Sequence, residues 1–212
     1  MSKTSPSNSS SLNERFITFE GPEGAGKSTQ IRRLAERLEA AGDEVVLTRE
    51  PGGTPLGEAI RGLLQHDAAG EAPVPAAEAY LFAASRAQHV ANLIRPALER
   101  GAWVLSDRFV DSSAAYQGAG REFEVGDILQ LNALAVGGLM PRITFLLDIS
   151  PEDAAERMKD RAADRIESEA RAFHERVRAG FLALAKNEPA RFCLIDATAS
   201  EDEIAALIDA RV

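Results

Sequence analysis

The sequence predicts an α/β fold: a five-stranded, mainly parallel sheet with helices on both faces, in three layers. Short apolar runs alternate with longer stretches whose apolar residues recur at helical spacing. The runs are almost continuously apolar, which is typical of parallel strands buried on both faces. The first run is followed at once by a glycine-rich turn and then a helical pattern, as strand-to-helix crossovers require.

Bulk composition limits the partners. The 212 residues are enough for one sizeable core, and the net charge of −9 argues against a nucleic-acid polymer or an anionic membrane as a main partner. Cys193 is the only cysteine, so a reduced cytoplasm is expected. No apolar run approaches the ~18 residues of a membrane span.

The N-terminal segment differs from the rest. Residues 1–13 are rich in Ser and Asn and poor in apolar residues, so we expect a disordered extension before one domain over 14–212. An apolar strand then begins at Phe16 and runs into the glycine-rich turn.

That turn satisfies the pattern G-x-x-x-x-G-K-[ST] from Gly21 to Ser28. Glycines let backbone N–H groups point inward, the helix N-terminus adds its positive end, and Lys27 adds a mobile charge. We therefore predict a cradle for a triphosphate, with the Ser28 hydroxyl on Mg²⁺. A glycine-rich turn opening an ordinary helix is the alternative, and the flanking strand and helix disfavour it. The predicted ATP-binding residues are Gly21, Pro22, Glu23, Gly24, Ala25, Gly26, Lys27, Ser28 and Thr29.

The next elements follow from apolar spacing. Helical spacing over 28–41 stops at Gly42, and 44–48 reads as a buried strand. The loop over 49–55 is dense in proline and glycine, and 56–64 is a short helix. A long helical pattern over 76–100 is expected to bend or restart near Pro96.

Two residues of that helix lie on one face. Phe82 and Arg86 are four residues apart, so an aromatic ring and a guanidinium could meet one ligand. For an isolated pair, a core phenylalanine and a surface arginine would be the plainer reading.

A third strand over 103–107 ends at Asp107 and Arg108, where open α/β sheets bind ligands. Residues 112–120 are small and polar and could line a pocket. A helix around 129–136, a strand over 143–148 and a helix over 151–158 follow. The predicted order then closes with a strand over 192–196 and a helix over 201–212.

Six arginines fall between Arg157 and Arg178, interleaved with carboxylates, a pattern usually belonging to a solvated helix face. His66, His89 and His174 lack the spacing of a zinc site, and each is expected at the surface.

Four motifs in order closely resemble the bacterial thymidylate kinases. They are Gly21 to Thr29, Arg49 to Thr54, Asp107 to Phe109 with Tyr116 to Gly118, and Asp164 to Glu167. The match extends from about Phe16 to the C-terminus. It implies a phosphate-loop NTPase fold of the nucleoside-monophosphate-kinase type, Mg²⁺-assisted transfer of the ATP γ-phosphoryl group to dTMP giving dTDP for dTTP synthesis, and a homodimer.

The resemblance also implies roles. Glu23 matches an acidic residue near the acceptor's 3′-hydroxyl and phosphate. Because Gly24 stands where some relatives carry a catalytic arginine, the charge is expected from a lid at about 157–170. Its candidates are Arg161 and Arg165, which replaces the solvated-face reading.

The remaining implied residues form an acceptor pocket. Phe82 resembles the residue that stacks on thymine, Arg86 the donor to its O4, and Arg108 a clamp on the acceptor phosphate. Tyr116 resembles the residue that crowds the 2′ position. Asp107 joins Ser28 at the metal, and the other expected substrate contacts are Arg49, Pro51 (which would follow a cis peptide), Ser112, Ser113 and Gln117.

Two alternatives belong to other classes. A deoxynucleoside kinase would share the fold but would place a base beside a sugar hydroxyl in place of arginines for an acceptor phosphate. A regulatory GTPase or non-catalytic nucleotide-binding module would carry guanine readout such as Asn-Lys-x-Asp, which the sequence lacks.

Overall fold

The computed structural model describes residues 12–66, 69–161 and 164–212. Its centre is one five-stranded sheet in the order β2-β3-β1-β4-β5, and every pair is parallel. The predicted three-layer α/β fold is confirmed. The strands are β1 (Phe16–Glu20), β2 (Val45–Arg49), β3 (Trp103–Asp107), β4 (Ile143–Asp148) and β5 (Phe192–Asp196).

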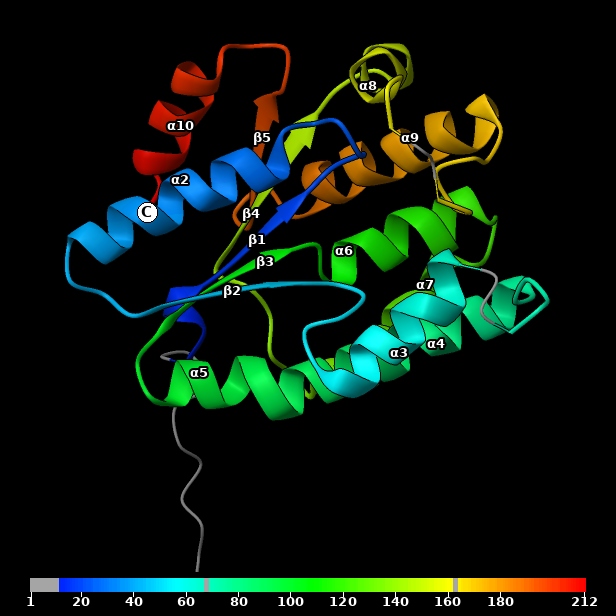
Figure 1. Ribbon diagram of the computed structural model, residues 1–212, viewed down its shortest axis with the longest axis horizontal. Helices are drawn as coiled ribbons and strands as arrows, with labels where there is room; N and C mark the ends of the chain where they lie inside the picture. Colours follow the sequence, from blue (N-terminus) through cyan, green and yellow to red (C-terminus); the bar gives the residue numbers. More distant parts are fainter. Residues whose placement is uncertain (1–11, 67–68, 162–163) are drawn as a thin grey trace, which may run out of the picture.

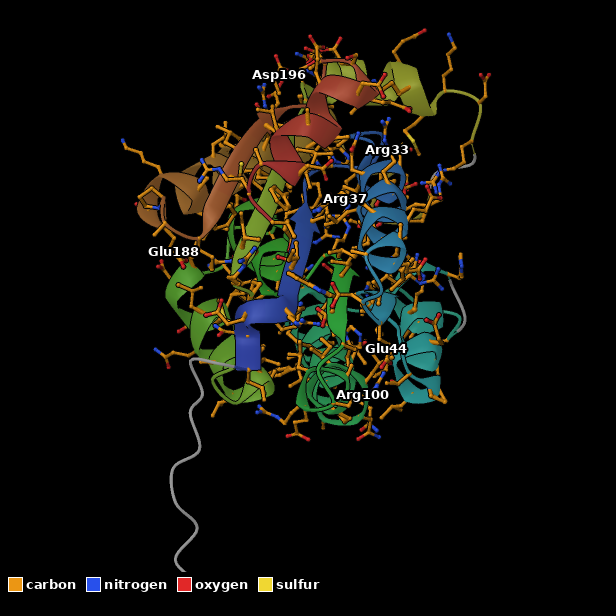
Figure 2. The ribbon with its side chains drawn as sticks, turned by 90° about the vertical axis from the view of Figure 1, so that its left-hand side faces the viewer. Arg33, Arg37, Glu44, Arg100, Glu188 and Asp196 are labelled. Atoms are coloured by element: carbon orange, nitrogen blue, oxygen red, sulfur yellow. The ribbon has the colours of Figure 1, made fainter. Side chains whose placement is uncertain are left out.

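The first strand, β1, lies in the middle of the sheet. It pairs with β3 on one side and β4 on the other, and Phe19 is in register with both Asp107 and Phe145. The turn after β1 therefore emerges where the strand order reverses direction, the usual ligand crevice of open α/β sheets. In Figure 2, Asp196 marks the carboxyl-terminal end of the sheet, and Glu44 lies toward the opposite end.

Helices cover both faces (Figure 1). On one face, α2 (Lys27–Ala40), α8 (Pro151–Met158) and α10 (Glu201–Asp209) pack on Ile17, Phe19 and their neighbours. Arg33 and Arg37 of α2, labelled in Figure 2, form ion pairs with α10. The other face is covered by α4 (Pro75–His89), η2 (Val90–Ile94), α5 (Arg95–Glu99), α6 (Val110–Ser113), η3 (Ala114–Gly120), α7 (Val125–Val136) and α9 (Arg171–Asn187), with α3 (Pro55–Gln65) packed on α4.

The long helix predicted over 76–100 is present but changes its winding. Between α4 and α5 the segment η2 is π-helical, and it ends just before Pro96. Proline has no N–H and its ring clashes with the carbonyl four residues earlier, so a wider turn relieves the conflict. The expected irregularity therefore begins about one turn before the proline.

Helix α9 was not predicted as an element. Its buried side chains, Phe173, Val177 and Phe181, recur every four residues beneath the arginine-rich face. A Cβ at Gly180 would lie 2.8 Å from the Ala119 Cβ, so glycine allows α9 to approach η3 closely. This contact fixes the wall that carries Tyr116.

The predicted boundary of the N-terminal extension needs a correction. Leu12 packs against the cluster around Val90 and Ile94, and η1 (Asn13–Arg15) forms a 3-10 turn before β1. Residues 1–11 lie outside the described residues. Within the described ranges, none of the helices has the length and apolar character needed to span a bilayer.

Candidate functional site

The phosphate loop connects β1 to α2 at the carboxyl end of the sheet. Gly21, Gly24 and Gly26 have φ values of 129°, 76° and 90°, which side-chain-bearing residues rarely adopt. A Cβ at Gly21 would also collide with the carbonyl oxygen of Leu147 on β4. The glycine pattern is therefore required both by the turn and by the neighbouring strand.

Lys27 lies inside this loop and is 3% exposed. Its ammonium group donates to the carbonyl oxygens of Gly21 at 3.2 Å and Pro22 at 2.9 Å, and lies 3.8 Å from Glu23 Oε1. Burial lowers the pKa of Lys27, and the charge of Arg108 lowers it further, against the opposing effect of Glu23. The charge of Lys27 therefore faces the loop interior, where a phosphate would bind.

Glu23 balances two cations. Its carboxylate accepts from Arg108 at 2.8 Å, and Lys27 lies on its other side. The charge of Lys27, with that of Arg108, holds the pKa of Glu23 well below its usual range although burial opposes the shift. Ionised Glu23 thus connects the phosphate loop to Arg108, which directly follows β3.

The structure brings together the two predicted metal residues, Ser28 at the start of α2 and Asp107 at the end of β3. The Ser28 hydroxyl donates to Asp107 Oδ2 at 3.4 Å, while Asp107 Oδ1 is buried and has no partner among the described residues. Mg²⁺ in phosphate sites takes one or two protein oxygens beside phosphate and water oxygens. The described residues hold no group of three metal-binding side chains that could suffice alone. The two oxygens therefore fit a metal held jointly with nucleotide phosphates.

Arg108 occupies the centre of the site in an unusual conformation. Its φ is 74°, in the left-handed region where non-glycine residues are uncommon and where strain often accompanies function. The guanidinium donates to Gly21 O and Ser112 Oγ and lies over the Tyr116 ring at 5.1 Å. The Arg108 side chain therefore joins two other predicted substrate residues, Ser112 and Tyr116, to the phosphate loop.

Sequence reasoning missed Glu20, the last residue of β1. Its buried carboxyl accepts from the Phe109 N–H at 2.8 Å, and also contacts the Ser112 N–H and hydroxyl at 3.3 and 2.6 Å. Burial raises the pKa of Glu20 to about 8, with Asp111 adding to the shift and Arg108 opposing it. Glu20 thus fixes the chain on the far side of Arg108. Glu20 lies two residues after Thr18, so both side chains point to the same face of the sheet. This spacing was the sequence signal that could have placed Glu20 inside the protein.

The loop after β2 is fixed by α3. The Glu50–Pro51 peptide bond is cis, as the resemblance implies. Glu58 accepts from Arg49 at 3.1 Å and from the Gly53 N–H at 3.0 Å. The exposed guanidinium of Arg49 is therefore held at the carboxyl end of β2 without being buried.

Arg86 is 1% exposed and belongs to a buried network. It donates to Glu50 at 2.8 Å and Asn132 at 2.6 Å, and its Nη2 donates to Phe109 O and Ser113 Oγ, both at 3.0 Å. These bonds use four of its five N–H groups and leave one on Nη1 without a partner in the described chain. Arg86 is therefore a buried residue and not a surface charge, and one N–H group remains for a ligand.

The prediction that His89 lies at the surface is wrong. His89 is fully buried, with Nδ1 at 2.9 Å from Glu50 Oε1 and Nε2 at 2.7 Å from Thr48 Oγ1. Glu50 thus joins His89 and Arg86 beneath the loop. His66 is exposed, as expected, and His174 is half-buried.

The remaining predicted pocket residues lie on α4, α6 and η3. Phe82 and Tyr116 are half-buried and pack against one apolar cluster that includes Ala115 and Phe173. Ser112, Ser113 and Gln117 are buried on α6 and η3. Ser112 and Tyr116 contact the Arg108 guanidinium, whereas Ser113 binds Arg86 and Gln117 binds Glu78.

The two lid candidates differ. Arg161 is 55% exposed and pairs with Glu167. Arg165 is 23% exposed, and its guanidinium donates to Glu78 at 2.5 Å and to Leu64 O at 2.9 Å. Residues 162–163 of the predicted lid lie outside the described residues. Arg165 is thus held in a structural pair, whereas Arg161 can reorient.

Arg157, at the start of this segment, joins the phosphate loop to β5. It donates to Gly24 O at 3.1 Å and to Ala197 O at 2.9 Å. Sequence reasoning gave it no role, since its partners are carbonyl groups that leave no sequence signal.

Comparison with known proteins identifies this arrangement. The family model described as thymidylate kinase matches residues 19–208. The chain belongs to the thymidylate kinase family. The expected resemblance is confirmed, and the family's reaction is ATP-dependent phosphorylation of dTMP to dTDP.

Individual thymidylate kinases are similar along most of their length. The one from an Exiguobacterium strain is 53% identical over 194 residues, which cover 89% of this chain and 91% of that protein. The one from Deinococcus radiodurans is 52% identical and covers 93% and 95%. The crystal structure of the thymidylate kinase from Ehrlichia chaffeensis matches with a TM-score of 0.69 at 38% identity, covering 85% of this chain and 91% of that one.

Proposed function

We propose that the chain transfers the γ-phosphoryl group of Mg²⁺-bound ATP to dTMP, using the site around Arg108. The observation that carries the proposal is the junction of two phosphate-binding segments. Arg108 contacts both Gly21 O and Glu23 of the phosphate loop, while the Arg108 guanidinium also faces the Tyr116 and Ser112 wall. Donor and acceptor phosphates bound there would be adjacent.

Phosphoryl transfer requires positioning and charge more than covalent help from the protein. Lys27 and the N-terminus of α2 would hold the donor phosphates, and Arg108 would exchange Glu23 for the acceptor phosphate. Ser28 and Asp107 would hold Mg²⁺, which supplies charge neutralisation between the β- and γ-phosphates when bound. Each side chain starts from a position already oriented toward the phosphate loop.

The acceptor base would lie over Phe82, within reach of the unpartnered Arg86 N–H. The Ser113 hydroxyl would lie beside the base, and it already accepts a hydrogen bond from Arg86. Tyr116 would crowd the 2′ position, as the family resemblance implies, and its ring lies under the Arg108 guanidinium. This arrangement favours a deoxynucleoside monophosphate, whose phosphate would bind Arg108. A nucleoside has no phosphate for that guanidinium to bind.

Arg161 is the better lid candidate for the transition-state cation. Arg161 follows Arg157, which contacts the phosphate loop at Gly24 O, and its charge contributes to lowering the pKa of Glu23. Its partner Glu167 is a neighbour in the same segment, and the pair is exposed enough to exchange with a ligand. Arg165 would instead serve to hold the segment.

We also propose a cytoplasmic homodimer. Helix α4 packs against both α3 and α7, and each of these helices exposes apolar side chains. Leu63, Tyr80 and Leu134 are 36%, 66% and 84% exposed. Burying such residues against a second copy would be favourable. Sedimentation should give a dimer for the intact chain, and Tyr80→Asp with Leu134→Lys should shift it to monomer.

An ADP-release assay tests the reaction. ATP is offered with dTMP, dUMP, dCMP, the ribonucleotide of thymine, thymidine or no acceptor. We expect dTMP to be used best, and Lys27→Ala to abolish turnover while unfolding remains cooperative, because its loss removes charge without opening a core cavity. Lys186→Ala, an exposed lysine on α9, is the matched control. Preference for thymidine over dTMP would reject the proposed function.

A further inference from the structure

A buried carboxylate outside the phosphate site gathers three donors from different parts of the chain. Glu78, on α4, is 1% exposed. Its Oε1 accepts from Gln117 at 2.9 Å, and its Oε2 accepts from Arg121 at 3.1 Å and Arg165 at 2.5 Å. The Glu78 side chain therefore contacts both η3, through Gln117, and the segment that follows Arg161, through Arg165.

The charges around Glu78 balance only while the carboxylate is ionised. Arg121 also pairs with Glu169, so two guanidinium groups and two carboxylates form a neutral cluster. Burial alone would raise the pKa of Glu78, but the hydrogen bonds from Arg121, Arg165 and Gln117 outweigh burial and hold the pKa below its usual value. Without the carboxylate, Arg165 would lose its charged partner in the described chain.

Apolar packing reinforces the same attachment. Ile166, next to Arg165, is 8% exposed and belongs to the cluster on which Phe82 and Tyr116 pack. Phe82 lies four residues after Glu78, on the same side of α4. The segment 164–169 is thus docked on the acceptor pocket by an ion pair and a buried side chain together.

We propose that Glu78 is a positioning residue that couples the acceptor pocket to the lid. It holds segment 164–169 against α4 through Arg165 and orients Gln117 through its other oxygen. The docked segment leaves Arg161, on its N-terminal side, as the arginine that can reach the phosphates. The catalytic consequence rests on the proposed function, whereas the docking itself does not.

Two readouts separate these parts. Amide hydrogen exchange of residues 164–169 reports docking without any nucleotide. The ratio of ADP released to dTDP formed reports whether water replaces dTMP as acceptor when the lid is displaced. The variants are Glu78→Gln, which keeps shape and an acceptor for Gln117, and Arg165→Gln, which is less buried and safer for folding.

In both variants we expect exchange over 164–169 to rise by at least about tenfold, and exchange over 151–158 to stay unchanged. The ADP to dTDP ratio should rise from near one to several-fold above one. Arg165→Lys should restore docking in part, because it keeps the charge but not the planar fork. Arg171→Gln, which removes an exposed arginine that pairs only with Glu152 and Glu175 among the described residues, should change neither readout.

Unchanged exchange in Arg165→Gln would overturn the proposal, as would a uniform rise across the chain in Glu78→Gln, which would make Glu78 a general stability residue. A changed exchange with an unchanged ADP to dTDP ratio would overturn the coupling. If no acceptor supports turnover in the unmodified protein, the proposed function fails, and the exchange data still decide whether Glu78 docks the segment.

Discussion

Arg108 donates to Glu23 Oε1 at 2.8 Å, so the guanidinium at the end of β3 is already paired with a phosphate-loop carboxylate. An incoming acceptor phosphate would replace that carboxylate as the anion beside Arg108. Arg108 is therefore paired with an anion both before and after the acceptor binds. This pairing offsets the desolvation cost of the buried guanidinium in the substrate-free protein.

Arg108→Lys should therefore weaken the acceptor selectively. Lysine supplies a point charge and cannot reproduce bonds to Gly21 O, Ser112 and Glu23 together. We expect the KM for dTMP to rise by a factor equivalent to about 1.5–3 kcal/mol, and the KM for ATP to change little. Steady-state kinetics with each substrate varied in turn checks this, and equal losses for both would show that Arg108 does not act selectively on the acceptor.

Arg86→Ala should lower stability as well as acceptor binding. The substitution leaves the buried Glu50 carboxylate with His89 but without its guanidinium. Removing one partner of a buried ion pair costs about 3–5 kcal/mol of unfolding free energy. Urea unfolding measures this, alongside the dTMP affinity, which should fall by about 1.5–3 kcal/mol if the remaining N–H donates to thymine O4.

A loss confined to stability would make Arg86 a structural residue. Asn132→Ala offers a comparison, since it removes another partner of the same guanidinium while leaving the charge pair intact.

Arg161→Ala should lower kcat much more than it weakens ground-state binding. Arginines that meet the charge developing during phosphoryl transfer contribute about 10³–10⁵ in kcat. Arg161→Lys should recover only part of the loss. Single-turnover rates, with substrate affinities measured separately, test this, and a kcat within about tenfold of the unmodified protein, about 1.4 kcal/mol, would exclude Arg161.

Glu20 should make stability depend on pH. Its pKa is raised from 4.5 to about 8, so the folded protein holds this proton more tightly than the unfolded chain does. The stabilisation is fully present below about pH 4.5 and is lost as pH rises through about 8. Melting temperatures across this range should fall more steeply for the unmodified protein than for Glu20→Gln.

The control is Glu188→Gln, which changes a half-exposed carboxylate beside Arg191. Its pH profile should keep the steep fall, and parallel profiles for Glu20→Gln and the unmodified protein would remove Glu20 as the cause.

Local patterns predicted the strands well and long-range contacts poorly. The spans of β3, β4 and β5 match the predicted ranges because apolar runs bounded by polar residues are local signals. His89 was misplaced because Glu50, its buried partner, comes from another element. The same limit hid Glu20 and Glu78, since a carboxylate's surroundings depend on residues that are far away along the chain. The apolar spacing of α9 was present but was overlooked beneath its arginines.

The strand order also has a consequence for how this fold can diversify. The predicted substrate residues that follow β2 and β3 lie on one side of β1. On the other side, Arg157 connects the phosphate loop to the residue after β5. Substitutions on α4 could therefore change the proposed nucleoside pocket while the phosphate loop and its contacts with β4 and β5 stay as they are. An engineer seeking a kinase for a different monophosphate could vary the positions around Phe82 and leave Arg108, Ser112 and the phosphate loop as they are.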